Sequence, residues 1–336
     1  MRVLITGASG FIGSFLVEEA IRRGYEVWAG VRASSSLERL PVDKIQWIDL
    51  KYHDPEALTG QIAAHADQHG AWDYVIHNAG LTKSIRQSDF FRVNAEYTRR
   101  FLAALSQTGC RPSKFLLMSS LSTYGAGNPQ TLDPIRPEDP QKPETIYGKS
   151  KLLAEQYVCG QDHFPYVILR PTGVYGPGDK DYGMAIESIR SGLDFAVGMK
   201  PQYITFVYVK DLATVTFQAL ENVTVRNRDY FVADGDVYTD TQFARLIQEV
   251  LQKKRVFRAR IPQWLVWLVC LCSEWTGRLT GSAKTLITDK YKILKQRNWI
   301  CDTDPLRNEL GFKPAYTLRK GLEETIKEAN KHMIDK

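Results

Sequence analysis

The sequence predicts an α/β fold, in which a doubly wound parallel sheet is followed by a smaller C-terminal lobe. Short apolar runs rich in β-branched residues alternate with helical stretches through the first half of the chain. A glycine-rich segment directly follows the first of these runs, and the alternation loosens after residues 173–183. The chain has 336 residues, more than the ~250–300 at which a single hydrophobic core stops growing, so two lobes are expected.

The first half contains six expected strands and the helices that connect them. The strands are expected at residues 2–6, 25–31, 44–50, 73–80, 114–120 and 166–171. Helices are expected at 11–23, 55–69 and 89–108, and within 144–158. Nearly continuous apolar strands separated by helices are typical of a parallel sheet that is covered on both faces.

The second half is expected to supply most of the smaller lobe. We assign residues 1–178 to the larger domain and 179–336 mainly to the lobe, with a segment at about 203–232 returning to the larger domain. The most apolar stretch, residues 261–275, is shorter than the ~20 residues needed to cross a bilayer. A buried helix at 262–272 is favoured there over an interfacial helix that contacts lipid or a greasy substrate.

Composition restricts the classes of partner. The net charge of +6 is mild, and the densest basic run, residues 253–258, lacks the aromatic interleaving of a nucleic-acid module. We therefore expect a small-molecule substrate, no nucleic acid and no transmembrane segment. Five cysteines, without paired spacing except for Cys270 and Cys272 inside an apolar run, and an N-terminus that begins with a strand favour a cytoplasmic protein. The histidines show no metal-ligand spacing, so no metal is expected.

The glycines of "LITGASGFIG" predict a phosphate-binding turn. Gly7, Gly10 and Gly13 lie at the exit of the first strand and the start of the first helix. Glycines there let backbone N–H groups approach a pyrophosphate, which the positive end of the helix attracts. The triplet alone is a weak signal, but this position at the start of an alternating chain predicts a dinucleotide site. The alternative is a glycine-rich turn without a ligand.

The end of the second strand favours NADP(H) over NAD(H). An NAD site usually has an acidic residue there to hold the ribose diol. This chain instead has "AGVRASSS", and the guanidinium of Arg32 suits a 2′-phosphate. Arg32 could also be a solvated loop residue, so NAD stays possible. Asp49, at the end of the third strand, could accept from the adenine amino group or cap the following turn.

Tyr147 and Lys151 form a candidate proton-transfer pair. A spacing of four residues puts both side chains on one helix face. We expect the lysine ammonium, together with an oxidised nicotinamide, to lower the pKa of the phenol from its usual ~10, so that it can exchange a proton with a carbinol. Ser120, at the tip of the fifth strand, could hydrogen-bond the same oxygen.

The motifs as a set resemble an extended short-chain dehydrogenase/reductase, the NAD(P)-dependent epimerase/dehydratase family. They are "TGASGFIG", "VIHNAG", "VNAEYT", "FLLMSSLSTYG", "YGKSK", "LRPTGVYGPG", "FVYVKDLA" and "LGFKPAYTLRKGLEETI". The resemblance implies a Rossmann NAD(P)-binding domain and a catalytic triad of Ser120, Tyr147 and Lys151, with Lys151 also holding the nicotinamide ribose. Ser122 competes with Ser120, which is preferred because it matches the family position before "xxxYG".

The resemblance also implies which further residues bind the cofactor. They are Ser9, Phe11 and Ile12 in the cradle, Asp49 and Leu50 beside adenine, Ala79 and Gly80 along the cofactor, Asn94 after the fourth strand, and Pro171 and Val174 near the nicotinamide. A homodimer formed by the fourth and fifth helices is common among relatives and is implied in the same way.

Two departures from the family bear on the substrate. Sugar-nucleotide enzymes of the family often have an asparagine where this chain has Gly173, and an arginine where it has Ile204. Both missing residues are polar anchors, so the sequence favours an NADP(H)-linked oxidoreductase that acts on a non-nucleotide carbonyl or alcohol. Lys83 or Arg86 could supply an anion contact elsewhere, which leaves a nucleotide-sugar epimerase or dehydratase as the alternative. A non-catalytic dinucleotide sensor is disfavoured because both Tyr147 and Lys151 are present.

Overall fold

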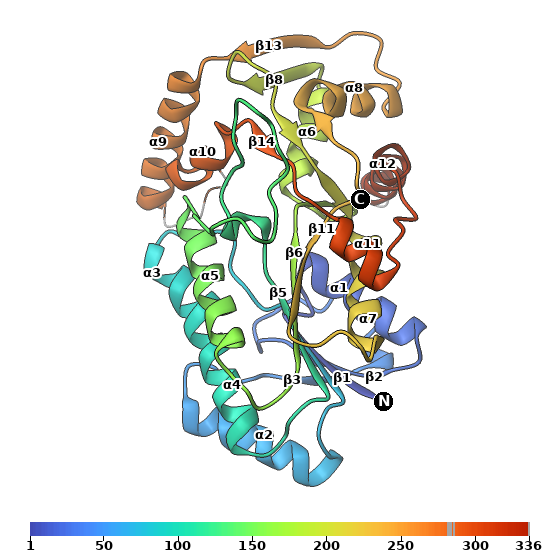
Figure 1. Ribbon diagram of the computed structural model, residues 1–336. Coiled ribbons are helices and arrows are strands. Elements are labelled where there is room, and N and C mark those ends of the chain that lie inside the picture. The colour runs from blue at the N-terminus through green and yellow to red at the C-terminus, as the bar shows by residue number, and fades with distance from the viewer. Residues whose placement is uncertain (281–283, 285, 335–336) are drawn as a thin grey trace.

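The structure, a computed structural model, describes residues 1–280, 284 and 286–334. Its centre is a seven-stranded sheet in the order β11-β6-β5-β4-β1-β2-β3, and every neighbouring pair is parallel (Figure 1). The strands are β1 (Arg2–Thr6), β2 (Glu26–Gly30), β3 (Gln46–Ile48), β4 (Tyr74–His77), β5 (Lys114–Met118), β6 (Tyr166–Pro171) and β11 (Arg228–Val232).

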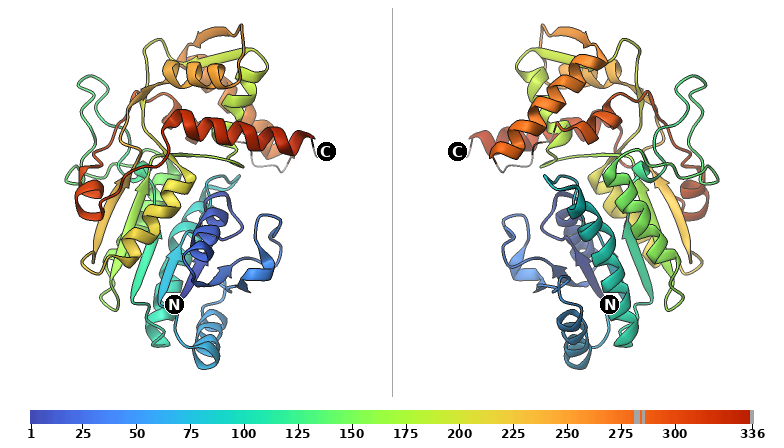
Figure 2. Two further views of the ribbon diagram at one scale, coloured as in Figure 1. Left: turned by 90° about the vertical axis from the view of Figure 1, so that its right-hand side faces the viewer. Right: turned by 90° about the vertical axis from the view of Figure 1, so that its left-hand side faces the viewer.

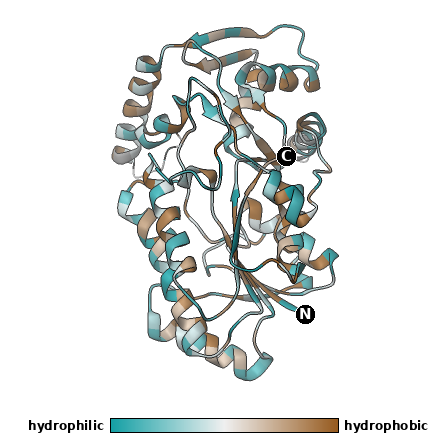
Figure 3. Cartoon of the chain, in the orientation of Figure 1, coloured by the Kyte–Doolittle hydropathy of each residue, from teal (hydrophilic) through white to brown (hydrophobic). Residues whose placement is uncertain are grey.

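Helices cover both faces of this sheet. On one face lie α1 (Phe11–Arg22) and α7 (Val209–Glu221), and on the other lie α2 (Pro55–His69), α4 (Tyr97–Gln107) and α5 (Ile146–Cys159). The alternation of strand side chains divides the core accordingly: Val3 and Ile5 pack with the first group, whereas Leu4 packs with the second. The apolar strands at the centre of the molecule are visible in Figure 3. The doubly wound fold predicted from the sequence is confirmed.

The predicted bounds differ most where a strand leads into the site. The third, fourth and fifth strands were expected to continue to residues 50, 80 and 120, but they end at Ile48, His77 and Met118. The residues beyond these ends lie outside the strands, although the N–H of Ser119 still donates to the carbonyl of Leu169 in β6. The expected helix 89–108 is three elements: α3 (Gln87–Phe90), a π-helical turn (Phe91–Glu96) and α4.

The smaller lobe stands above the carboxyl ends of the strands. Its core joins α6 (Asp181–Arg190), α8 (Asp240–Val250) and α12 (Leu318–Ile334) with β7 (Gly173–Tyr175) and β10 (Phe206–Tyr208). The remaining elements are β8 (Leu193–Val197), β9 (Tyr203–Ile204), β12 (Tyr238–Thr239), β13 (Phe257–Ile261), α9 (Gln263–Thr280), α10 (Thr288–Leu294), β14 (Asn298–Trp299) and α11 (Asp304–Leu310). Within the second half, α7 and β11 lie with the large sheet, where α7 contacts α1.

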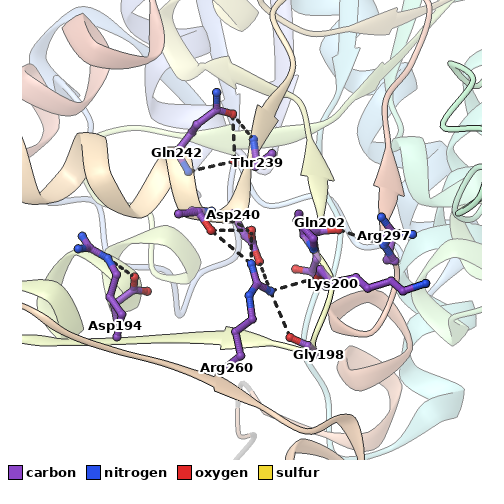
Figure 4. A network of polar contacts seen from close by, with 12 residues as sticks. Asp194, Gly198, Lys200, Gln202, Thr239, Asp240, Gln242, Arg260 and Arg297 are labelled. Atoms are coloured by element: carbon purple, nitrogen blue, oxygen red, sulfur yellow. Dashed lines mark hydrogen bonds and ion pairs between the residues drawn. The ribbon is translucent and has the colours of Figure 1, made fainter.

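A polar network fixes β13 to the lobe. The guanidinium of Arg260 pairs with the carboxylate of Asp240 at 3.1 and 3.2 Å and donates to the carbonyls of Gly198 and Lys200 (Figure 4). Asp240 is also the first residue of α8, whose cap Thr239 forms a capping box with Gln242. The pair therefore ties the β8–β13 ribbon to the start of α8.

The apolar helix expected at 262–272 is present, but the expectation that it is buried is wrong. α9 begins at Gln263, and its apolar side chains face outward: Trp264 is 67% exposed and Trp275 is 65% exposed. Apolar composition indicates that a helix needs a cover, but it does not say whether that cover belongs to the same chain. None of the helices within residues 1–280, 284 and 286–334 is both long and apolar enough to cross a membrane.

Candidate active site

The glycine turn is packed too closely for side chains. Gly7 has a φ of +66°, and a Cβ on it would lie 2.8 Å from the Cα of Ala79. A Cβ on Gly13 would lie 2.1 Å from the carbonyl oxygen of Gly7. The cap of α1, Gly10, provides no side-chain hydrogen bond, and the first turn holds no acidic residue. The start of α1 therefore presents free N–H groups and a positive dipole end, which fits a dinucleotide pyrophosphate.

Tyr147 and Lys151 lie on the first two turns of α5, next to this cradle. The Nζ of Lys151 donates to the carbonyl of Met118 at 2.5 Å, at the end of β5. The Nζ of Lys151 also lies near Gly80: a Cβ placed on this glycine would be 3.9 Å from the Nζ. Ser120, two residues beyond β5, hydrogen-bonds the phenol of Tyr147. The three predicted catalytic residues are thus brought together at the carboxyl ends of the strands, where doubly wound folds bind ligands.

Burial dominates the electrostatics of the pair in the protein alone. Burial raises the pKa of Tyr147 above its ordinary value, and the hydrogen bond from Ser120 only partly opposes this. Burial also lowers the pKa of Lys151 to about 8, against the attraction of Glu155, which raises it. The expectation that Lys151 and an oxidised nicotinamide together lower the pKa of the phenol stays a prediction, because in the protein alone desolvation sets the direction of the shift. The phenol carries its proton at neutral pH.

Ser120 and Ser122 have different surroundings. The Oγ of Ser120 accepts from the backbone N–H of Ser122 at 3.2 Å and caps the short 3₁₀ helix Leu121–Thr123. The carbonyl of Ser122 instead faces α5, where a Cβ on Gly148 would meet it at 2.3 Å. Since Ser120 is the serine that bonds the phenol, the geometry favours it over Ser122.

Asn94 acts on the site through the backbone. It is 1% exposed, and its side chain accepts from the N–H of Leu81 at 2.6 Å and donates to the carbonyl of Leu81 and to Ser150. It thereby ties the segment after β4 to α5. The π-helical turn that contains Asn94 directs it inward, as such turns often do at functional sites.

The other predicted cofactor residues lie in the glycine turn, on α1 and at or beyond the ends of strands. The N–H of Ala79 donates to Thr6, which also contacts the buried His77. Pro171 ends β6, and Val174, on β7, packs against the core of the larger half. Ser9, Phe11 and Ile12 belong to the turn and to the first turn of α1, and Leu50 is buried beyond β3.

The two candidate recognition residues for the adenosine end are placed differently. Arg32 is exposed, two residues beyond the end of β2. The carboxylate of Asp49 forms an ion pair with Lys51 at 2.5 Å. Arg32 is thus available for a phosphate, whereas Asp49 already has a partner. Arg39, which the sequence analysis missed, places its guanidinium against Gly178, where a Cβ would lie 2.4 Å from it.

Two interactions that hold α5 in place were not predicted from the sequence. Arg170 of β6 and Glu155 of α5 form a buried ion pair at 2.9 Å, one turn beyond Lys151. At the other end, both carboxylate oxygens of Asp289 in α10 accept from the N–H of Ile146, at 3.1 and 3.0 Å. Only the arginine lies within a quoted motif, "LRPTGVYGPG"; nothing in the sequence pairs Asp289 with a residue so distant.

A pocket adjoins Tyr147 between the two lobes. The ring of Phe90, one of its lining residues, makes an edge contact with the ring of Tyr147 at 6.5 Å between centroids. The pocket is lined by Ser84, Ile85, Gln87, Phe90, Ile146, Glu274, Gly277, Lys284, Ile287, Thr288 and Asp289. The wall from the small lobe thus comes from α9 and α10, and the wall from the large lobe from α3 and α5.

The positions that depart from the family pattern have apolar or aromatic neighbours. A Cβ on Gly173 would lie 2.2 Å from the hydroxyl of Tyr182, so this ring occupies the space beside the glycine. Ile204 packs against the apolar core of the small lobe. Lys83 pairs with Asp181 at 3.0 Å, Arg86 is exposed beside the lining residue Ile85, and Lys284 lines the pocket. No group of three metal-ligating side chains gathers anywhere in the described part of the chain.

Known proteins resemble this chain over nearly its whole length. The model of the NAD dependent epimerase/dehydratase family matches residues 3–233. A 3-beta-hydroxysteroid dehydrogenase of Mycolicibacterium neoaurum is 26% identical over 97% of this chain and 90% of its own. A UDP-glucose 4-epimerase of Vibrio cholerae is 24% identical over 96% and 94%. Among solved structures, a UDP-glucose 4-epimerase of Thermotoga maritima with UDP-glucose covers 99% of this chain and 100% of its own, with a TM-score of 0.77 and 22% identity.

Proposed function

The chain belongs to the NAD dependent epimerase/dehydratase family and is thus an oxidoreductase or epimerase, and from this premise we propose an NADP(H)-linked oxidoreductase that acts on a carbonyl or secondary alcohol of a non-nucleotide substrate. The observation that carries the proposal is the meeting of Ser120, Tyr147 and Lys151 beside the glycine cradle. A proton donor next to a dinucleotide site is what hydride transfer to a carbonyl requires.

Each residue has a stated task in this proposal. A bound nicotinamide supplies or takes the hydride. Tyr147 gives its phenolic proton to the carbonyl oxygen during reduction, or takes the hydroxyl proton of the alcohol during oxidation. Ser120 hydrogen-bonds the reacting oxygen and holds it near the phenol. The ammonium group of Lys151 offsets the negative charge left on the phenol oxygen when its proton leaves, and it also binds the ribose of the cofactor. Burial raises the pKa of the phenol in the protein alone, so Tyr147 is in the protonated form that proton donation to a carbonyl needs.

Two observations support a non-nucleotide substrate. The hydroxyl of Tyr182 occupies the space next to Gly173, where many sugar-nucleotide enzymes carry a polar anchor. Ile204, at the second anchor position, packs into the lobe core. The relative from Mycolicibacterium neoaurum is named a 3-beta-hydroxysteroid dehydrogenase, which agrees with the loss of both polar anchors at Gly173 and Ile204.

The alternative is a nucleotide-sugar epimerase or dehydratase, which the Vibrio cholerae relative favours. Protection against thermal unfolding distinguishes the two. With NADP⁺ present, we expect UDP- and dTDP-sugars to change the melting temperature little. Strong stabilisation by such a sugar would reject the non-nucleotide assignment and favour the alternative.

Tyr147→Phe tests the proton donor. The variant keeps the ring and its contact with Phe90 but loses the hydroxyl. We expect turnover of a carbonyl substrate to fall by about 10²–10⁴-fold, while the dissociation constant of NADPH stays within about twofold. Screening of aldehydes, ketones and hydroxysteroids by NADPH absorbance supplies the assay. Full activity in the variant would refute the assignment of Tyr147.

Arg32→Ala tests the cofactor. We expect a 2′-phosphate to form charge-assisted hydrogen bonds with this exposed guanidinium, so the variant should bind NADPH about 10–100-fold more weakly and NADH unchanged. Fluorescence titration with both nucleotides measures the difference. Equal affinities of the wild type for NADH and NADPH would contradict the preference for NADP.

A further inference from the structure

The outward face of α9 carries a continuous apolar stripe. The stripe consists of Trp264, Trp267, Leu268, Leu271, Trp275 and Leu279, which are exposed by 41–68%. Except for the neighbours Trp267 and Leu268, they follow one another at intervals of three or four residues, which places all six on one side of the helix. In the view of α9 from its own side (Figure 2, right), this helix lies across the front of the small lobe.

This arrangement is the reverse of an ordinary surface helix, which buries its apolar stripe and exposes its polar one. The side of α9 that faces the lobe holds Cys270 and Gly277, both buried, and Glu274. Glu274 accepts from the backbone and the hydroxyl of Thr288 in α10. The packing of α9 against its own lobe therefore leaves the apolar stripe exposed.

The ribbon that precedes α9 extends the same kind of surface. In the β8–β13 pair, Phe257 lies opposite Leu193, and Phe195 lies two residues along, so the three side chains share one face. They are exposed by 64%, 40% and 50%. The opposite face carries Arg258 and Arg260, which pair with aspartates of the lobe, the latter in the network of Figure 4.

The charge around this surface is strongly one-sided. Residues 253–297 contain eleven lysines and arginines but only two acidic residues, whereas the remainder contains 33 basic and 36 acidic ones. Lys254 and Arg255, in the loop before β13, are exposed, and so is Lys200. None of these three side chains forms an ion pair with any described residue. Lys254 and Arg255 flank the Phe257 end of the ribbon, and Lys200 lies near Gln263 at the start of α9. The combined apolar surface of α9 and the ribbon thus has cations at its edges that form no ion pair within the described residues.

We propose that α9, together with the outer face of the β8–β13 ribbon, docks the protein on the surface of an anionic lipid bilayer. An amphipathic helix too short and too polar to span a membrane can lie in its interface, with its apolar face among the acyl chains. Tryptophan favours this depth because its ring is apolar and its N–H remains hydrogen-bonded. The lysines and arginines then meet anionic headgroups.

Charge also decides between lipid and a second copy of the chain. A two-fold dimer through this surface would bring two segments of the same net positive charge into one interface, and like charges repel. An anionic headgroup layer has the opposite sign. Docking does not rest on the proposed function, although it would bring the pocket beside Tyr147, which Gly277 of α9 lines, close to the bilayer.

Vesicle co-sedimentation of the full-length protein tests the proposal. We expect the wild type to bind vesicles of phosphatidylcholine with phosphatidylglycerol, and to bind pure phosphatidylcholine at least about fivefold more weakly. Trp264→Glu combined with Trp275→Glu should reduce binding to the anionic vesicles by at least about tenfold. Charge reversal of Lys254 and Arg255 should remove the preference for anionic lipid.

Trp47→Glu is the matched control, because Trp47 is 58% exposed on β3, far from α9. It should bind vesicles as the wild type does. Melting temperature and NADPH binding establish that each variant is folded, and Leu268→Gln with Leu271→Gln replaces the tryptophan pair if that pair fails to fold. Absence of vesicle binding by the wild type, or equal binding by a folded α9 variant, overturns the proposal. Light scattering that shows a dimer broken by the α9 substitutions, without vesicle binding, assigns the surface to a second copy instead.

Discussion

The ammonium group of Lys151 is held among backbone groups rather than in water. The side chain is 4% exposed, and its Nζ donates to the carbonyl of Met118. Burial lowers its pKa to about 8, although Glu155 acts in the opposite direction. The buried cation thus lowers the free energy of unfolding. Such a cost is expected where a charge serves a reaction rather than stability.

Lys151→Met should therefore stabilise the fold at neutral pH. The unfolded lysine titrates near ~10.4 and the folded one at about 8, so between these values the unfolded state binds more protons and the stability of the wild type rises with pH. We expect the variant to exceed the wild type by about 2–3 kcal/mol at pH 7, and the difference to shrink above pH 8. Urea unfolding at a series of pH values measures it.

Lys149→Met supplies the comparison, because Lys149 is exposed on the same helix. Its stability relative to the wild type should change little with pH. If Lys151→Met shows the same flat profile, the ammonium is not desolvated as described.

Sequence spacing could predict part of this local arrangement. A separation of four residues placed Tyr147 and Lys151 on one helix face, and the motif order placed Ser120 near them. The spacing could not predict the sign of the tyrosine pKa shift, because desolvation depends on the packing around the phenol. It also could not predict that Asp49 is paired with Lys51.

At the scale of elements, local signals determined which predictions succeeded. α2 begins and ends where the sequence indicated, because Asp54 caps it, Pro55 opens it and Gly70 follows it. The helix expected at 89–108 is interrupted by a π-helical turn that has no such local signal. The hydrogen bonds of Asn94 with Leu81 and Ser150 accompany that turn, and both partners come from other elements.

The glycine cradle is an element whose packing can be tested with one pair of substitutions. Gly13→Ala would force a Cβ to within 2.1 Å of the carbonyl of Gly7, whereas Gly60, inside α2, has nothing within 4 Å of that position. We expect Gly60→Ala to stabilise the protein by about 0.5–1 kcal/mol through helix propensity. Gly13→Ala should destabilise it by about 1–3 kcal/mol through overpacking and weaken NADPH binding.

Thermal unfolding and NADPH titration of both variants give the two readouts. Wild-type stability and affinity in Gly13→Ala would show that the turn has room for a side chain. That result would remove the close approach of backbone and phosphate on which the dinucleotide site depends.

At the scale of the whole molecule, contacts between the lobes were beyond the reach of the sequence. Asp289 accepts from the N–H of Ile146 between the lobes, across 143 positions, and within the small lobe Lys290 pairs with Asp181 across 109. Neither residue belongs to a motif, and charged residues are common on surface helices. The exposed stripe of α9 was misjudged for a related reason: apolar periodicity gives the width of a face but not the identity of what covers it.

Asp289 connects the small lobe to the turn of α5 that carries Tyr147, so it should act as a positioning residue. Asp289→Ala would leave the N–H of Ile146 without its acceptor and allow that turn to shift relative to the cradle on α1. We expect a loss of about 1–3 kcal/mol in stability. We also expect kcat to fall by about tenfold, because a small misplacement of an acid is costly.

A comparison of the NADPH dissociation constant with kcat distinguishes a positioning role of Asp289 from a general loss of folding. The dissociation constant of NADPH should change by less than about twofold, because the cradle lies on the other lobe. Asp289→Asn keeps an oxygen acceptor and should recover most of the turnover. Lys292→Met removes a 3.3 Å neighbour of the same carboxylate and an exposed 3.3 Å hydrogen bond to the carbonyl of Glu144, but it leaves the acceptor of the Ile146 N–H in place, so it should behave as the wild type. If Asp289→Ala weakened NADPH binding and turnover equally, the carboxylate would support the fold as a whole, and the small lobe would have no separate part in placing the phenol.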